Sequence, residues 1–321
     1  MRKNLHYKVL ASVLAIAGLY FYNAPAAWAG MQKVQEDINE IWVGNGEVNG
    51  NYQIPDNAEV YGWYSQYPTY GNSTNKANKN QITINNSTLT KVSGGFTVST
   101  DQTDYSANNN TVTITNSCIQ AIYGGESNSG IAYNNNVLIK GSKNEFDRVA
   151  GGTTAIGKAT GNTVTINGNV TANSFIAGGA GNEGSTISNN HVIIEGGTVK
   201  GNICGGYNRQ NANVESITDN DITIKDSAIV ADANLYGGFA DNLYDDNAIK
   251  NNKLILNGWS GSVNSVQNFS AIDFEEVNWK NDGTVLTITE SPANALANTT
   301  LNLISFAGGT DRKSTRLNSS H

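Results

Sequence analysis

The sequence lacks long amphipathic segments, and this absence narrows the folds that it can adopt. None of its repeating units contains the 3.6-residue hydrophobic periodicity that a helical or leucine-rich repeat requires. Beyond residue 22 there is no apolar run long enough for a membrane-spanning helix. Helical repeat folds are therefore excluded for the body of the chain.

Histidine and cysteine are scarce, which limits the chemistry available. Two of the three histidines, His6 and His321, lie near the chain ends, so His191 stands alone. A Ser/His/Asp or Cys/His mechanism needs more partners than this, and we assign no catalytic residue. Cys118 and Cys204 occupy different positions of the repeat described below, three units or roughly 14 Å apart. A disulfide requires Cα atoms within about 7 Å, so we expect two free thiols.

Basic residues are also few. The chain has 20 Lys and Arg against 27 Asp and Glu, a net charge of −7. Without residues 1–29 and 311–321, considered below, the counts become 20 − 6 = 14 and 27 − 1 = 26, a net charge of −12. No basic patch is present for nucleic acid or anionic lipid, and we expect neither as a partner.

What the sequence does contain is a repeat with two signatures. The first is an alternating strand triplet after an asparagine, as in Asn162-Thr163-Val164-Thr165-Ile166. It recurs at steps of 30, 25, 27, 28, 30 and 32 residues, starting at Ile82, Val112, Val137, Val164, Val192, Ile222 and Leu254. The second is an apolar residue two places before a glycine pair, found at Val92, Ile122, Val149, Ile176, Ile203 and Leu235. A repeat of this length indicates a solenoid or array.

The period of two within each unit predicts β-strands. Stacked units place like positions about 4.8 Å apart in columns, so that together they bury an apolar face that one unit cannot. A β-propeller is the alternative, but its blades need four strands in roughly 40 or more residues. We therefore predict an all-β fold, a right-handed parallel β-helix (β-solenoid) with an N-terminal cap. The residues before the glycine pairs form an inward column, and the glycines turn a corner.

Asparagine is unusually abundant: the chain has 48 Asn and 34 Gly. Asparagine suits corners because it tolerates the left-handed conformation and bonds its own backbone. Stacked in register, asparagines also form side-chain ladders. A disordered, prion-like chain has a similar composition, but regular apolar spacing has no role there and favours the solenoid.

The chain divides into five segments. Residues 1–29 resemble a secretory signal, with a basic start, an apolar core over residues 9–22 and a small-x-small cleavage site at Ala27-Trp28-Ala29. An N-terminal membrane anchor is the alternative. Residues 30–75 form the cap region, residues 76–258 the seven β-helix rungs, and residues 259–310 an incomplete continuation. The last segment, residues 311–321 (DRKSTRLNSSH), resembles the conceptual translation of a common short-read sequencing adapter, and we interpret it as an artefact.

The cap region has two ambiguous features. Residues 32–42 are compatible with a short helix. Aromatic side chains then crowd residues 42–70, which covers the open end of the solenoid or provides a surface for stacking carbohydrate. We favour the cap and keep the carbohydrate surface as the alternative.

Candidate binding residues lie next to the glycine pairs, since the loops of a solenoid usually carry its binding surface. We expect two exposed loops, residues 207–213 and 239–246, together with outward-facing tyrosines. The candidates are Tyr123, Tyr207, Asn208, Arg209, Tyr236, Phe239, Asp241 and Tyr244. Tyrosine offers rigid amphipathic contact area at low entropic cost.

An acidic loop is the one candidate for metal binding or catalysis. Asp241, Asp245 and Asp246 offer the oxygen ligands that Ca²⁺ prefers, but we favour the simpler interpretation of a solvated polar loop. The GGxGxDx calcium repeat is absent. We therefore assign no metal site and no cofactor.

The signal, the Asn-x-Val-x-Ile and apolar-x-Gly-Gly repeats, and the stretch from Val266-Gln267-Asn268-Phe269 to Leu286-Thr287-Ile288 resemble passenger regions of bacterial autotransporter adhesins. The resemblance covers roughly residues 76–310 and specifies architecture better than ligand. It implies an exported protein on the bacterial surface, attached to the outer membrane through a C-terminal barrel that this sequence does not contain.

We therefore expect an adhesin-like binding or display module that is not an enzyme. Its ligand would be an unknown host protein or glycan. The alternatives are a secreted β-helix enzyme that acts on polysaccharides and a purely structural stalk.

Overall fold

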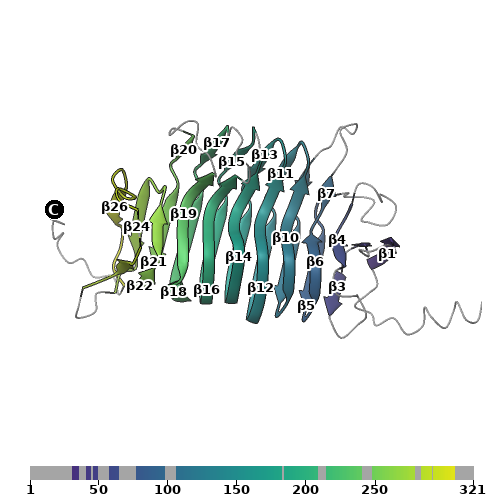
Figure 1. Ribbon diagram of the computed structural model, residues 1–321, viewed down its shortest axis with the longest axis horizontal. Helices are drawn as coiled ribbons and strands as arrows, with labels where there is room; N and C mark the ends of the chain where they lie inside the picture. Colours follow the sequence, from purple (N-terminus) through teal and green to yellow (C-terminus); the bar gives the residue numbers. More distant parts are fainter. Residues whose placement is uncertain are drawn as a thin grey trace, which may run out of the picture.

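The protein is a parallel β-solenoid of about seven turns, seen in a computed structural model (Figure 1). The turns stack along the long axis of the molecule, with each strand beside its equivalent in the next turn. The structure describes residues 31–35, 41–44, 46–49, 58–64, 77–97, 106–182, 184–208, 215–240, 248–278, 283–290 and 292–307. Within these ranges every regular element is a strand, so the predicted all-β fold class is confirmed.

Three sheets contain all the strands of the described residues. The large sheet consists of β1 (Met31–Gln35), β2 (Ile41–Gly44), β3 (Gly46–Asn49), β4 (Glu59–Tyr61), β5 (Gln81–Asn85), β6 (Thr88–Ser93), β7 (Phe96–Thr97), β9 (Thr111–Thr115), β10 (Cys118–Ser127), β12 (Asn136–Thr154), β14 (Thr163–Gly181), β16 (His191–Asn208), β18 (Asp221–Ile229), β19 (Ala233–Ala240), β21 (Lys253–Asn257), β23 (Ser265–Gln267), β24 (Ala271–Glu275) and β26 (Thr300–Leu303). The small sheet consists of β8 (Ala107–Asn108), β11 (Ile131–Tyr133), β13 (Lys158–Thr160), β15 (Thr186–Ser188), β17 (Ser216–Thr218) and β20 (Ile249–Lys250). The third sheet pairs β22 (Gly261–Val263) with β25 (Leu286–Ile288).

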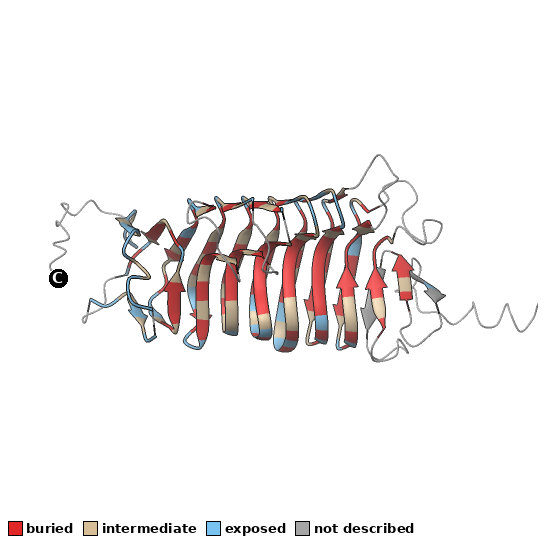
Figure 2. Cartoon of the chain, turned by 45° about the horizontal axis from the view of Figure 1, so that its top comes forward, coloured by how far each residue is buried: buried red, intermediate tan, exposed pale blue. Residues whose placement is uncertain are grey.

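The register of the parallel strands is the one that the repeat predicts. Val137 pairs with Val164, which pairs with Val192. The second signature stacks in the same way: Val149 lies beside Ile176. The predicted inward column is fully buried at each of its six positions, Val92, Ile122, Val149, Ile176, Ile203 and Leu235. Figure 2 shows this burial as red bands that cross successive strands at the same height.

At each glycine pair the backbone is crowded by the neighbouring turn and by the opposite side of its own turn. A Cβ atom added to Gly178 would lie 2.8 Å from the carbonyl oxygen of Gly205 and 2.9 Å from the Cβ of Asn190. Gly124, Gly151 and Gly205 face the asparagine of their own turn in the same way. No side chain fits in this space, because real Cβ contacts do not come so close. The glycine pair and the asparagine before the next strand triplet are therefore two sides of one constriction.

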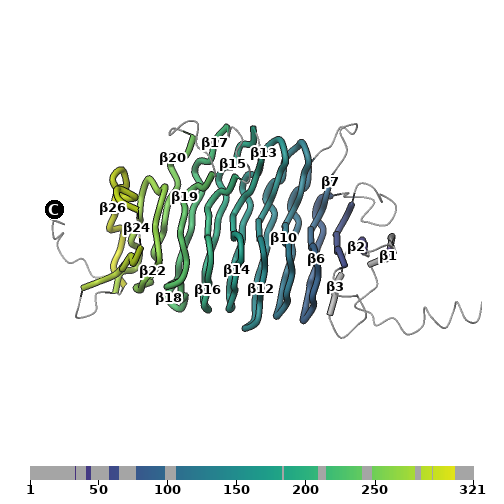
Figure 3. The backbone as a smooth tube through the Cα atoms, in the orientation of Figure 1, coloured from purple at the N-terminus to yellow at the C-terminus, as the bar shows by residue number. Residues whose placement is uncertain are grey.

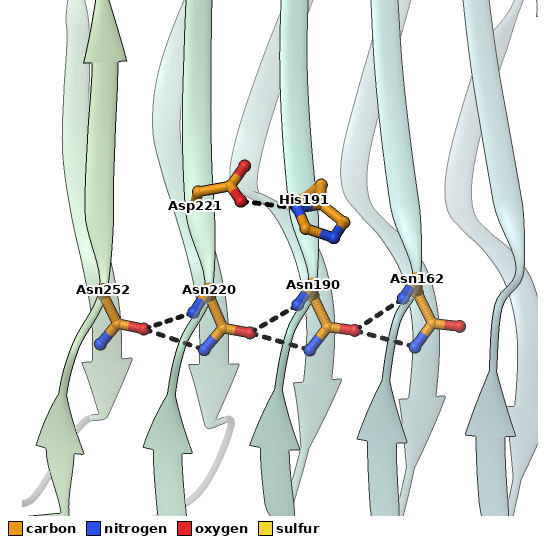
Figure 4. A network of polar contacts seen from close by, with 6 residues as sticks. All are labelled: Asn162, Asn190, His191, Asn220, Asp221 and Asn252. Carbon is orange, nitrogen blue, oxygen red and sulfur yellow. Dashed lines mark hydrogen bonds and ion pairs between the residues drawn. The ribbon is translucent and has the colours of Figure 1, made fainter. Parts of the chain in front are cut away.

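The constriction is held by a continuous ladder of buried asparagines (Figure 4). In each step, the backbone N–H and the Nδ2 of one asparagine donate to the Oδ1 of the next, at 2.9–3.0 Å. From the second member on, Nδ2 also donates to a backbone carbonyl of the small sheet side. The ladder residues are Asn80, Asn110, Asn135, Asn162, Asn190, Asn220 and Asn252. The ladder expected from composition is thus present, and from Asn110 to Asn252 each buried amide is hydrogen-bonded through both its oxygen and its nitrogen.

The residue before each ladder asparagine explains part of the remaining asparagine content. Asn109, Asn134, Asn189 and Asn251 all have φ between 53° and 58°. Among non-glycine residues, Asn and Asp adopt this left-handed conformation most readily. A repeated corner thus selects the same residue type in several turns.

Three further expectations can be compared with the structure. The short helix with which residues 32–42 are compatible does not form in their described parts: residues 32–35 and 41–42 belong to β1 and β2, which form an antiparallel pair, and β2 continues into the parallel stack through β4. Strand pairing with the first turn overrides the weak local preference for helix. Both cysteines are free, as predicted, with Cys118 exposed and Cys204 buried. Among the described residues, no helix is long and apolar enough to cross a membrane.

Candidate binding groove

The bend at each glycine pair creates a concave strip on the outer surface. Adjacent residues of a strand face opposite sides, so Ile122 enters the core while Tyr123 joins a separate apolar cluster outside it. Side chains before and after the bend then line one hollow. We call this strip the outer groove and define it by Lys91, Phe96, Ala121, Tyr123, Glu126, Arg148, Thr153, Phe175, Ala180 and Tyr207. It runs along the solenoid across β6, β10, β12, β14 and β16, whose backbones lie side by side in Figure 3.

The centre of the outer groove is a hollow of about 300 Å³. Small side chains make room for it: Ala121, Thr153 and Ala180 occupy positions where other turns carry aromatic or charged residues. Polar side chains complete its wall, namely Ser127, Asn128, Thr154 and Asn182. The volume is at the lower end of the range found for small-ligand sites.

An aromatic stack bounds the hollow on its N-terminal side. The rings of Tyr61 and Tyr64 are 4.7 Å apart, and the ring of Phe96 lies 5.1 Å from that of Tyr64, all nearly parallel. The Nζ of Lys91 lies 4.4 Å from the centre of the Phe96 ring and 5.5 Å from that of Tyr123. Such cation–π contacts fix an ammonium group over the rings.

A second aromatic cluster bounds the hollow on its C-terminal side. The Phe175 and Tyr207 rings are stacked at 4.0 Å, and Phe239 lies 5.3 Å beyond Tyr207 with an interplanar angle of 4°. Tyr236 meets Phe239 edge-on at 4.9 Å. Burial raises the pKa of the Tyr236 hydroxyl above its usual value.

Three charged side chains line the hollow, and two of them form a pair. The Nζ of Lys91 donates to Oε1 of Glu126 at 2.9 Å, and the two side chains are 17% and 14% exposed. Arg148 has a different environment. Its Nε is buried without a hydrogen-bond partner, and its ionic neighbour, Asp147, is 4.0 Å away. With two cations and one anion, the lining carries a charge of +1 in a chain whose net charge is −7.

The structure places the predicted binding residues in three different situations. Tyr207, Tyr236 and Phe239 are half-buried and belong to the aromatic cluster at the C-terminal side of the groove. The expected exposure of Tyr123 and Asn208 is wrong, because these residues are 7% and 0% exposed. Tyr123 lies in the corner of the bend.

Asn208 points to the opposite side of its strand from Tyr207, and its Nδ2 donates to the carbonyl of Asn182 at 3.1 Å. The remaining candidates lie outside the described residues: Arg209, Asp241, Tyr244, Asp245 and Asp246. Within the described part of the chain, no group of three or more His, Cys, Asp or Glu residues is arranged to hold a metal ion.

The most chemically distinctive residues of the groove were not predicted from the sequence. Lys91, Arg148 and Phe175 each stand immediately before an inward-column residue, and Glu126 follows a glycine pair. Since neighbours in a strand face opposite sides, the register already places these side chains outside the core. The signal was therefore present, but the concave bend that brings the two columns together was not visible in the sequence.

A larger hollow on another edge of the solenoid has a different character. It measures about 630 Å³, and its lining of Asn, Ser, Thr and Lys side chains contains no aromatic residue among the described positions. Cys118 and Glu145 lie at its edge. Burial and the nearby Glu145 carboxylate raise the pKa of the Cys118 thiol, which makes it less reactive than a free thiol. The outer groove is the stronger candidate, because it combines aromatic rings with a partly buried guanidinium whose Nε makes no hydrogen bond.

No protein-family model matches this chain, and neither the curated proteins nor the solved structures compared with it gave a match.

Proposed function

We propose that this chain is an exported, surface-displayed β-solenoid that works as an adhesin-like binding module, of the kind found in autotransporter passengers. The observation that carries the proposal is the outer groove. Elsewhere the outward faces of the main strands are dominated by small polar side chains such as Thr111, Thr113, Thr163 and Thr165. The groove instead gathers aromatic rings and charged groups around a hollow.

The physical properties of the groove suit recognition. Aromatic side chains contribute large, rigid contact areas at low entropic cost, and here they are preorganised by stacking from turn to turn. Extended concave surfaces are the usual binding surfaces of solenoid proteins. The signal-like residues 1–29 support export, and the loose resemblance of the repeats supports display on a bacterial surface.

Binding without turnover is favoured by the chemistry of the groove. Glycoside hydrolysis ordinarily uses two carboxyl groups, one on each side of the scissile bond. Among the described residues that line the hollow there is one carboxylate, Glu126, and it is paired with Lys91. A polysaccharide-active enzyme is the competing function, with the acidic residues 241–246 as its candidate centre.

The test compares the chain after removal of residues 1–29 with two single variants. Thr153→Trp fills the hollow, whereas Thr165→Trp adds the same side chain to the outward face of β14 away from the groove. We expect saturable binding to cell surfaces or extracellular matrix, lost in Thr153→Trp and retained in Thr165→Trp. Turnover of acidic or neutral polysaccharides, with or without Ca²⁺, would instead support the enzyme. The absence of both binding and turnover would leave the structural stalk.

A further inference from the structure

Arg148 is the cation of the outer groove whose buried Nε makes no hydrogen bond. Its side chain is 22% exposed and its Nε has no hydrogen bond. A guanidinium is planar, always charged and carries five donors in a fork that matches a carboxylate. Leaving the Nε of such a group buried without an acceptor is costly, and a ligand that supplies the missing acceptor removes this cost.

The other cation of the hollow has a different role. Lys91 is fixed between the Phe96 ring and the Glu126 carboxylate. Its charge is therefore compensated within the protein, while the nearest anion to Arg148 is 4.0 Å away and outside the lining of the hollow. The excess charge of +1 in the hollow is therefore assigned to Arg148, and an anionic group is the complementary ligand.

The rest of the wall indicates what carries that anionic group. The amide side chains of Asn128 and Asn182 line the hollow, and such groups bond the hydroxyls of a sugar, whereas the Ser127 and Thr154 hydroxyls are buried and hydrogen-bonded within the protein. The groove is also continuous along the axis, with aromatic clusters on both sides of the hollow. Between Phe96 and Tyr207 it spans four turn spacings, roughly 19 Å, which accommodates a chain and not only a single ring.

From these observations we infer that the outer groove binds a glycan chain with carboxylate-bearing sugar residues, and that Arg148 binds the carboxylate. This inference rests on the proposed binding function and gives it a ligand class. The Lys91–Glu126 pair positions the Phe96 side of the hollow, and the Phe175–Tyr207 stack closes the other side. Arg148 is the specificity-determining residue.

The experiment measures equilibrium binding of the chain without residues 1–29 to a panel of oligosaccharides. The acidic probes are oligomers of galacturonate, glucuronate-containing hyaluronan, alginate and polysialate. Methyl-esterified oligogalacturonate is the matched neutral probe, since it keeps the sugar backbone and removes the charge. Polyglutamate reports whether an acidic peptide binds instead.

We expect at least one acidic oligosaccharide to bind at least tenfold more tightly than the neutral probe and than polyglutamate. Arg148→Gln should reduce that affinity at least tenfold, and Arg148→Lys should restore part of it, because Lys keeps the charge but not the fork. Lys200→Gln is the matched control: Lys200 is 50% exposed and outside the hollow, and this variant should bind normally. A melting temperature within a few degrees of the parent shows that each variant is folded.

Three results would overturn the inference: no acidic oligosaccharide binds, the neutral probe or polyglutamate binds equally well, or folded Arg148→Gln binds with unchanged affinity. The proposed binding function is tested separately from the ligand class. If the chain binds cell surfaces in a manner that Thr153→Trp abolishes, but binds no acidic oligosaccharide, the groove is still the binding site and only the ligand class is wrong.

Discussion

The Nδ2 of Asn190 donates a hydrogen bond to the Oδ1 of Asn220 at 2.9 Å, with both side chains fully buried. The same Nδ2 donates to the carbonyl of Ala159, and the Oδ1 of Asn190 accepts two hydrogen bonds from Asn162. Each amide between the two ends of the ladder therefore links three turns of the solenoid. Within a low-dielectric interior, such a satisfied network is stabilising, while a broken one leaves several polar groups without partners.

Replacing Asn190 with leucine tests this ladder. The substitution removes the acceptor of two Asn162 donors and the donor to Ala159, and each buried group left unpaired costs about 1–3 kcal/mol. We expect the free energy of unfolding to fall by about 3 kcal/mol or more in urea denaturation. Asn173→Leu is the matched control, because Asn173 is exposed and makes only a long contact of 3.5 Å to Glu145. Equal stability of the two variants would contradict the role of the ladder.

A single methyl group at the constriction should also destabilise the fold. A Cβ on Gly178 would meet backbone atoms of Gly205 and His191 at 2.8 Å, and neither neighbour can move without displacing a strand. Gly178→Ala is expected to cost about 1–3 kcal/mol, as overpacking usually does. In Gly196→Ala the nearest atom is the Ser227 hydroxyl, also at 2.8 Å, which can rotate away. Thermal denaturation should therefore rank Gly178→Ala well below Gly196→Ala, and the reverse order would be inconsistent with the constriction.

The inward column gives a second packing test. Ile176 is fully buried, whereas Thr165 faces outward and is half-buried. An aspartate at position 176 would be an unpaired carboxylate in an apolar column, at a cost of several kcal/mol, on the order of 3–5. Thr165→Asp should be tolerated. Similar melting temperatures for the two variants would show that the column is wrongly assigned.

The ion pair between His191 and Asp221 predicts a pH dependence. The Nδ1 of His191 lies 2.6 Å from Oδ2 of Asp221, and this hydrogen bond raises the pKa of the histidine above 6.5. A raised pKa in the folded state stabilises the protein below the unfolded pKa, and the stabilisation is lost as the pH rises through the folded value. Asp221→Asn should therefore lower the melting temperature more at pH 5.5 than at pH 9. An equal effect at both pH values would exclude this linkage.

The repetitive parts of the fold could be predicted from the sequence because each constraint recurs in every turn. The position of Ile176 repeats in six turns, so its inward direction was visible without a structure. The asparagine ladder was also foreseeable, since Asn162 and Asn190 stand at the same place before their strand triplets.

The groove was predictable only in part. Tyr207 and Phe239 were identified as binding candidates, but Arg148 was not, since it occurs once and has no counterpart in the repeat pattern. Arg148 matters because the bend of the strands brings it to the same hollow as Thr153 and Glu126. This proximity between residues before and after the bend exists only in three dimensions. The β1–β2 pair was not predicted for a similar reason: β2 pairs with β4 of the first turn, and the local sequence does not reveal this partner.

The most direct test of the outer groove as the binding surface is arginine protection. Arg148 is in the groove, and Arg209 belongs to the loop that the sequence analysis proposed for binding. The chain without residues 1–29 is treated with phenylglyoxal, both alone and with a saturating concentration of the acidic oligosaccharide that bound in the equilibrium assay. The modified peptides are then quantified by mass spectrometry. The account predicts that bound ligand protects Arg148 from modification. Protection of Arg209, with the reactivity of Arg148 unchanged, would contradict it.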